Sequence, residues 1–186
     1  MHENFIKMEL TAEDKNWAVK KANADLKALE GTNYKSRFNT NKKENEITGN
    51  IGEAVFHRWL KINGVEHDWQ NNKIGEADDY DFLIDGKKWD VKTIMRHLPV
   101  TDLKDNFELG VNKGQVGLHA DYYFWVILQG HNPMAATFAY LVGSKSLNRI
   151  KEFPVQEKIT GAKAYWMPIA DALPALDTLN NTMRGC

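Results

Sequence analysis

One hairpin signal, between Tyr80 and Thr93, constrains this chain more than any other segment. Asp85-Gly86 is a two-residue turn sequence that separates two runs of alternating polar and apolar residues, as in a β-hairpin. Folding the chain at that turn places Asp81 opposite Asp90, with Lys92 on the same face two residues along. The opposite face is apolar and is expected to point to a core. It carries Phe82, Ile84, Trp89 and Val91.

The polar face of this hairpin concentrates negative charge. Two carboxylates that oppose each other on a strand pair destabilise it by roughly 0.2–1 kcal/mol. A divalent cation bound by oxygen ligands would compensate this negative charge. Lys92, beside the two carboxylates, is the third candidate member of such a site. The backbone carbonyl of Val91, between Asp90 and Lys92, is a further candidate ligand. A solvated Asp–Lys pair is the alternative, and the hairpin alone does not decide between the two interpretations.

A helix is expected from about residue 48 to residue 62. Its core-facing stripe consists of Ile51, Val55, Phe56, Trp59 and Leu60. Glu53 is a single acid among small and apolar neighbours, and Gly52 permits a close approach of the helix to a sheet. Asn50 and Glu53 also have capping-box spacing, so Glu53 has an alternative role at a helix start. The apolar pattern begins earlier, at Ile47, which favours a functional role for Glu53.

The pattern of the whole chain predicts one α/β domain with a mixed central sheet flanked by helices. The run Tyr122 to Leu128 is apolar on both faces and is therefore expected to be a central strand that is covered on both sides. We expect a single domain over residues 1–186, with a core at about 47–142 and additions in an N-terminal helix, 11–30, and a C-terminal helical tail, 144–186. The other expected elements are a loop at 32–45, strands at 65–69, 107–111 and 137–142, and helices at 144–150 and 170–179.

Composition excludes several classes of function. Cys186 is the only cysteine, so the chain has no internal disulfide and no cysteine-based zinc site. No apolar run approaches the roughly 20 residues of a membrane span, and the first residues lack a signal-peptide core. We therefore expect a cytoplasmic protein with no membrane partner. No Gly-rich loop ending in Gly-Lys-Ser/Thr occurs, which argues against a nucleotide cofactor.

The charge balance neither requires nor excludes nucleic acid. The chain has 24 Lys and Arg against 25 Asp and Glu, so any DNA-binding face must be local. Basic residues gather in two clusters, at positions 35–43 and 87–96, and a solvated surface is the preferred interpretation of either cluster taken alone. The candidate DNA contacts are Lys35, Arg37, Lys42, Lys43 and Lys113.

The candidate residues together resemble the PD-(D/E)XK nuclease superfamily. In that superfamily a helix carries a glutamate, a hairpin strand carries an aspartate, and the next strand carries (D/E)-x-K. Here Gly49-Asn50-Ile51-Gly52-Glu53 is followed by Asp81 and then by Asp90-Val91-Lys92. Tyr80 stands where the superfamily has a variable proline. The resemblance covers residues 47–142 approximately.

The resemblance implies a restriction-endonuclease-like fold and Mg²⁺-dependent cleavage of DNA, with Mn²⁺ as a substitute. It implies that Asp81 and Asp90 are metal ligands, that Glu53 assists directly or through water, and that Lys92 is the catalytic lysine. It also matches Gln115 with a glutamine that some members carry.

Several questions stay open at this point. His57 lies one turn after Glu53 and is an additional candidate for the same site, although packing is the commoner role of such a residue. A homodimer is expected, because one site cuts one strand and duplex cleavage needs two. The competing interpretations are a catalytically inactive nuclease-like module that binds DNA or a protein, and an unrelated α/β interaction module.

Overall fold

A seven-stranded mixed sheet forms the centre of the computed structural model, which describes residues 4–28, 42–71, 80–113, 120–159 and 162–183. Only β4 and β6 run parallel, and the other neighbouring pairs are antiparallel. The expected α/β class with a mixed central sheet is confirmed. The strand order is β1 (Ile6–Glu9), β7 (Phe138–Ser146), β6 (Tyr122–Gln129), β4 (Lys87–Arg96), β3 (Phe82–Ile84) and β2 (Asp68–Trp69), and β10 (Leu173–Pro174) pairs with β7.

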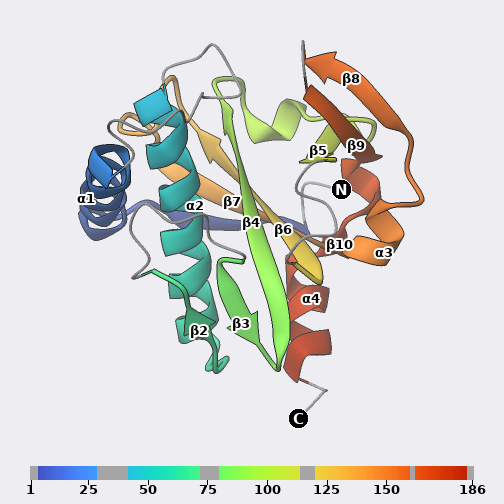
Figure 1. Cartoon of the computed structure of the whole chain (residues 1–186), viewed down its shortest axis with the longest axis horizontal. Coiled ribbons are helices and arrows are strands. Elements are labelled where there is room, and N and C mark those ends of the chain that lie inside the picture. Colours follow the sequence, from blue (N-terminus) through green and yellow to red (C-terminus); the bar gives the residue numbers. More distant parts are fainter. Residues whose placement is uncertain (1–3, 29–41, 72–79, 114–119, 160–161, 184–186) are drawn as a thin grey trace.

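Two helices, α1 (Ala12–Ala28) and α2 (Lys42–Ile62), lie together on one side of this sheet (Figure 1). Their small and apolar residues pack against the sheet in one core, in which Phe56 of α2 contacts the ring of Phe124 at 4.4 Å between centroids. Burial of such large aromatic side chains is a dominant stabilising contribution. Within the described residues, no helix combines the length and the apolar character that crossing a membrane requires.

A second, three-stranded antiparallel sheet covers the opposite side, on the right of Figure 1. It consists of β5 (Glu108–Asn112), β9 (Ala162–Pro168) and β8 (Val155–Ile159). Leu109 and Met167 from this sheet share a core with Trp125 and Ile127 of β6. Strand β6 is therefore buried on both faces, as its continuous apolar run predicts.

The β3–β4 hairpin has the predicted register. Phe82 pairs with Trp89, and Ile84 pairs with Lys87. Asp85 and Gly86 have φ angles of 48° and 67°, which is the left-handed conformation that a type I′ turn requires at both positions. The β3 ladder ends at the pair Phe82–Trp89, whereas β4 continues to Arg96. Within the described residues, β4 therefore has no paired strand on its β3 side from Asp90 onward.

The expected loop at 32–45 is wrong at its C-terminal end. Residues 42–45 belong to α2 and not to a loop, and the rest of the segment 32–45 lies outside the described residues. The first turn of α2 is exposed, so no apolar residue marks it in the sequence.

The C-terminal region is not a helical tail. Residues 144–146 extend β7, and β8 and β9 form a hairpin whose outer strand is exposed. The N-terminal strand β1 was also not anticipated, and it completes an edge of the central sheet. The remaining elements are the helix α3 (Leu147–Ile150), the helix α4 (Ala175–Met183) and the 3-10 helices η2 (Val100–Asp102) and η3 (Ile169–Asp171).

Candidate active site

Helix α2 docks on β4 through a very close contact at Gly52. A Cβ atom at this position would lie 1.9 Å from Thr93 Oγ1, so only glycine fits without movement. The Thr93 hydroxyl also donates a long hydrogen bond, 3.5 Å, to the carbonyl of Gly49. This contact fixes the backbone of α2 beside β4 at the residue that precedes Glu53.

Glu53 does not cap a helix start. Helix α2 begins eight residues before Asn50, at Lys42, and the buried Asn50 side chain donates to the carbonyl of Ala18 on α1 at 3.3 Å. The capping-box alternative for Glu53 is thus removed, and Glu53 lies in the middle of a long helix.

Asp81 lies directly before β3, at the point where the ladder ends. Its amide donates to the carbonyl of Trp89 at 2.9 Å, and its Oδ2 accepts the amide of Val91 at 2.6 Å. The Asp81 carboxylate therefore satisfies a backbone donor on the open edge of β4. It is held beside the peptide that joins Asp90 to Val91, rather than standing on the sheet face.

Asp90 and Lys92 project from the same face of β4 and form an ion pair. Lys92 Nζ lies 2.6 Å from Asp90 Oδ2, and the two side chains are 24% and 21% exposed. At this distance the pair is a charge-assisted contact, and Asp90 Oδ2 has the Lys92 ammonium group as its partner.

The charges of the cluster act on one another. Burial raises the pKa of Asp81 well above its usual range, and the charges of Glu53 and Asp90 raise it further. Lys92 and the Val91 amide offset only part of this shift. Glu53, Asp81, Asp90 and Lys92, from α2, the residue before β3, and β4, are therefore brought together as the sequence predicts.

Lys92 is held in its charged form. Burial alone would lower its pKa, but the carboxylates of Asp90, Asp81 and Glu53 outweigh burial and raise the pKa above its usual value. The protonated ammonium group suits charge stabilisation and hydrogen-bond donation better than proton abstraction.

The donor set fits a hard divalent cation. Mg²⁺ is usually bound by one or two carboxylates and keeps several of its waters. Asp81 and Asp90 are the pair best placed to hold it, because the Asp81 carboxylate is held beside the Asp90–Val91 peptide and its pKa is raised by burial, Glu53 and Asp90. Within the described residues, no three acidic, histidine or cysteine side chains already surround one point. A bound cation would therefore rely on waters or on a backbone carbonyl such as that of Val91.

The His57 side chain contacts His67 and Trp69. His67 Nδ1 donates to the carbonyl of Val65 at 2.8 Å, which leaves His67 Nε2 to face His57 Nδ1 at 2.7 Å. The His57 ring stacks on Trp69 at 4.3 Å between centroids. Burial, His67 and Lys61 lower the pKa of His57 to about 4.

A cavity of about 430 Å³ between α1, α2 and β2 is lined in part by His57, Arg58, Trp17 and Trp69. None of the four clustered catalytic candidates lines it. The role of His57 in the cluster at Glu53 gains no support from these contacts.

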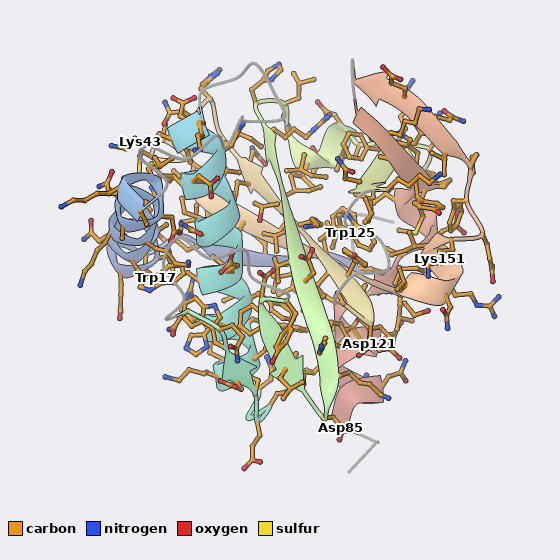
Figure 2. All side chains as sticks on the ribbon, in the orientation of Figure 1. Trp17, Lys43, Asp85, Asp121, Trp125 and Lys151 are labelled. Carbon is orange, nitrogen blue, oxygen red and sulfur yellow. The ribbon has the colours of Figure 1, made fainter. Side chains whose placement is uncertain are left out.

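The candidate DNA contacts are dispersed or lie outside the described residues. Lys42 and Lys43 occupy the first turn of α2, and Figure 2 shows Lys43 at the end of the molecule opposite the hairpin turn at Asp85. Lys113 is exposed directly after β5, and its amide donates to the carbonyl of Lys163 on β9. Lys35, Arg37 and Gln115 fall outside the described residues.

Sequence reasoning missed Tyr123. It lies beside Asp90 in the parallel β4–β6 pairing, and its ring centroid is 5.8 Å from Lys92 Nζ. Burial and the charges of Asp90 and Asp81 raise the pKa of its hydroxyl, which therefore stays protonated. The sequence indicates only that this residue belongs to a central strand, because the partner of β6 is not readable from local pattern.

Comparison of the chain with protein families, with curated proteins and with solved structures gave no match. The interpretation of the site consequently depends on its own geometry and electrostatics.

Proposed function

We propose that the chain is a Mg²⁺-dependent endonuclease that hydrolyses DNA phosphodiester bonds, with Mn²⁺ as a substitute metal. The catalytic residues in this proposal are Glu53, Asp81, Asp90 and Lys92. The supporting observation is their cluster, in which burial and the charges of Glu53 and Asp90 raise the pKa of Asp81, and the three carboxylates outweigh burial and raise the pKa of Lys92. Perturbed pKa values that arise from burial together with specific charge partners are typical of functional sites.

The order and type of these residues also resemble the PD-(D/E)XK nucleases, and a restriction-endonuclease-like core is part of the proposal. Asp81 and Asp90 would hold the metal, with Glu53 assisting. When bound there, Mg²⁺ supplies Lewis acidity at the phosphoryl group and lowers the pKa of a coordinated water.

The chain's own side chains have separate tasks in this reaction. The oxygen of a water forms a bond to phosphorus as that water releases a proton to solvent, the bond from phosphorus to one sugar oxygen breaks, and that sugar oxygen takes up a proton from solvent. Lys92, held as an ammonium group, stabilises the negative charge that builds on the phosphoryl oxygens. The Val91 amide keeps the Asp81 carboxylate in place beside Asp90 while this occurs.

A homodimer in the cytoplasm is part of the same proposal, since two sites are needed to cut both strands of a duplex. Lys42, Lys43 and Lys113 remain candidate DNA contacts. A catalytically inactive DNA-binding or protein-interaction module is the alternative. The presence of all three carboxylates together with a charged lysine favours the enzyme. Buried charges lower the stability of the fold, and selection would not retain them in a site that had lost its activity.

The direct test combines cleavage and binding. Supercoiled, linear and branched DNA are incubated with the protein in Mg²⁺, Mn²⁺ or EDTA, and DNA binding is measured in Ca²⁺. Metal-dependent cutting that EDTA abolishes supports the enzyme. Tight binding without cutting of any substrate would favour the inactive module.

A further inference from the structure

One aromatic side chain forms a wall of the cluster without being one of its charged members. Tyr123 on β6 is 1% exposed and lies next to Asp90 in the parallel ladder. Side chains at paired positions of neighbouring strands project from the same face. The Tyr123 ring therefore lies on the face that carries Asp90 and Lys92.

The Tyr123 ring and the Asp90 carboxylate both lie close to the Lys92 ammonium group. Lys92 Nζ lies 5.8 Å from the Tyr123 ring centroid, within the range of a cation–π interaction, and 2.6 Å from Asp90 Oδ2. An ammonium group on a four-carbon stem is otherwise free to rotate into solvent. The ring and the carboxylate together restrict it to one location.

The neighbouring residue on the same strand offers a contrast. Tyr122 projects from the opposite face, where its ring stacks on Trp89 at 4.6 Å between centroids. It belongs to the core beneath α2, whereas Tyr123 belongs to the core shared with the three-stranded sheet. Two tyrosines of one strand therefore allow the loss of a ring at the cluster to be compared with the loss of a ring elsewhere.

We propose that Tyr123 is a positioning residue, whose ring holds the Lys92 ammonium against Asp90 and excludes water from that side of the cluster. The kinetic consequence rests on the proposed nuclease function, whereas the geometric consequence does not. In this proposal the effect is carried by the ring, through its cation–π contact with Lys92. Tyr123→Phe, which keeps the ring, is therefore expected to behave like the wild type.

The geometric test measures the accessibility of Lys92. The protein is treated briefly with an acetylating reagent, and modification of each lysine is followed by peptide mass spectrometry in the wild type, Tyr123→Leu, Tyr123→Phe and Tyr122→Leu. Loss of the ring should raise the rate at Lys92 by about fivefold or more, in keeping with loss of a desolvated cation–π contact. Tyr123→Phe and Tyr122→Leu should stay close to the wild-type rate.

Lys21 serves as an internal reference in the same samples. Its side chain is 8% exposed and pairs with Asp25 on α1, so its rate reports general loosening of the fold. An equal rise at Lys21 and Lys92 in Tyr123→Leu would overturn the proposal, as would an unchanged rate at Lys92 or a rise of the same size in Tyr123→Phe.

The kinetic test compares the same variants on the DNA substrate that the wild type cleaves. Tyr123→Leu should lose roughly tenfold in kcat with little change in KM, because the ring acts on Lys92 and not on DNA binding. Tyr123→Phe should restore kcat. A change confined to KM would overturn the positioning role. Absence of cleavage by the wild type would instead contradict the nuclease function, and the acetylation result would still decide the role of the ring.

Discussion

Gly52 and Thr93 hold helix α2 and strand β4 in direct contact. A Cβ atom at position 52 would meet Thr93 Oγ1 at 1.9 Å and Thr93 Cβ at 3.0 Å. The contact immediately precedes Glu53, so the approach of the helix determines where the Glu53 carboxylate lies relative to Asp81.

Gly52→Ala is expected to separate α2 from β4. The added methyl group must displace a β-branched side chain in a packed layer, at a cost of about 1–3 kcal/mol. Gly49→Ala is the matched control, because an added Cβ there meets nothing within 4 Å. That substitution should stabilise the helix by about 0.5–1 kcal/mol. Chemical denaturation of the two variants checks the opposite signs.

A second substitution identifies the clash partner. Thr93→Ala removes Oγ1 and Cγ2, two of the three Thr93 atoms that a Cβ at position 52 would meet, and leaves only the Cβ at 3.0 Å. The double variant Gly52→Ala/Thr93→Ala should therefore be more stable than the two single effects predict when summed. Simple additivity of the two effects would mean that the contact is not the source of the cost.

Asp81→Asn is expected to stabilise the metal-free protein at neutral pH. The pKa of the Asp81 carboxyl is raised by burial, Glu53 and Asp90, so its ionisation in the folded state is unfavourable. Asparagine keeps an oxygen for the Val91 amide. We expect a gain of about 1 kcal/mol or more, equivalent to roughly 2–4 °C in Tm in EDTA.

The pH dependence of this effect has a defined sign. A carboxyl with a raised pKa in the folded state binds its proton more tightly there than in the unfolded chain. Its contribution to stability is present at low pH and is lost as the pH rises from 3.8 through the raised value. Added Mg²⁺ should raise the Tm of the wild type and of Asp85→Asn, but not that of Asp81→Asn. Equal responses of all three proteins would contradict metal binding at Asp81.

His57 is expected to make the fold sensitive to acid. Its pKa is lowered to about 4 from the ordinary histidine value of 6.5, so the unfolded chain binds a proton before the folded chain does as the pH falls. Stability that is present above pH 6.5 is therefore lost as the pH falls toward 4. Because the ring is only partly buried, we expect about 1–2 kcal/mol rather than the full value of the shift.

The measurement is the difference in unfolding free energy between the wild type and His57→Phe from pH 7 to pH 4.5. Phenylalanine keeps an aromatic ring against Trp69 and cannot titrate. His131→Phe, at an exposed position, is the control. Parallel curves for the wild type and His57→Phe would show that His57 is not the source of the acid sensitivity.

Outside the cluster, substitution of Asp14 is expected to lower the free energy of unfolding more than substitution of an exposed charged residue. Its side chain is 6% exposed, accepts the Thr11 amide at 2.9 Å and pairs with Arg58 at 2.9 Å. Asp14→Ala removes the acceptor of the Thr11 amide in a capping box at the start of α1 and leaves the Arg58 charge without this carboxylate, at a cost of about 2–4 kcal/mol. Glu152→Ala breaks an exposed pair with Arg149 and should cost under about 0.5 kcal/mol. Similar losses measured by thermal unfolding would contradict this difference.

The hairpin was predictable because its determinants are local. Asp85-Gly86 supplies two residues that tolerate positive φ, and strict alternation fixes which side chains share a face. The register follows from those two features alone. The position of the Asp81 side chain does not, because it depends on where the β3 ladder ends and on the Val91 amide that is then left to satisfy.

The second sheet was not predictable because its pairing joins distant segments. Glu108 of β5 lies opposite Pro168 of β9, and β8 is exposed, so local apolar alternation is weak. For the same reason, the sequence did not reveal that Tyr123 lies beside Asp90. Its strand was identified correctly, but its place beside Asp90 depends on a parallel crossover that no local pattern encodes.

The most direct test of the central claim is the single-turnover rate of DNA cleavage in Mg²⁺ for the wild type, Asp90→Asn and Asp85→Asn. Both variants remove one carboxylate from the same hairpin, but Asp85 occupies the exposed turn, where asparagine also tolerates positive φ. We predict that Asp90→Asn loses at least about a hundredfold in rate, while Asp85→Asn cleaves like the wild type. Equal rates for the two folded variants, or cleavage that persists in EDTA, would contradict the assignment of this cluster as a metal-dependent nuclease site.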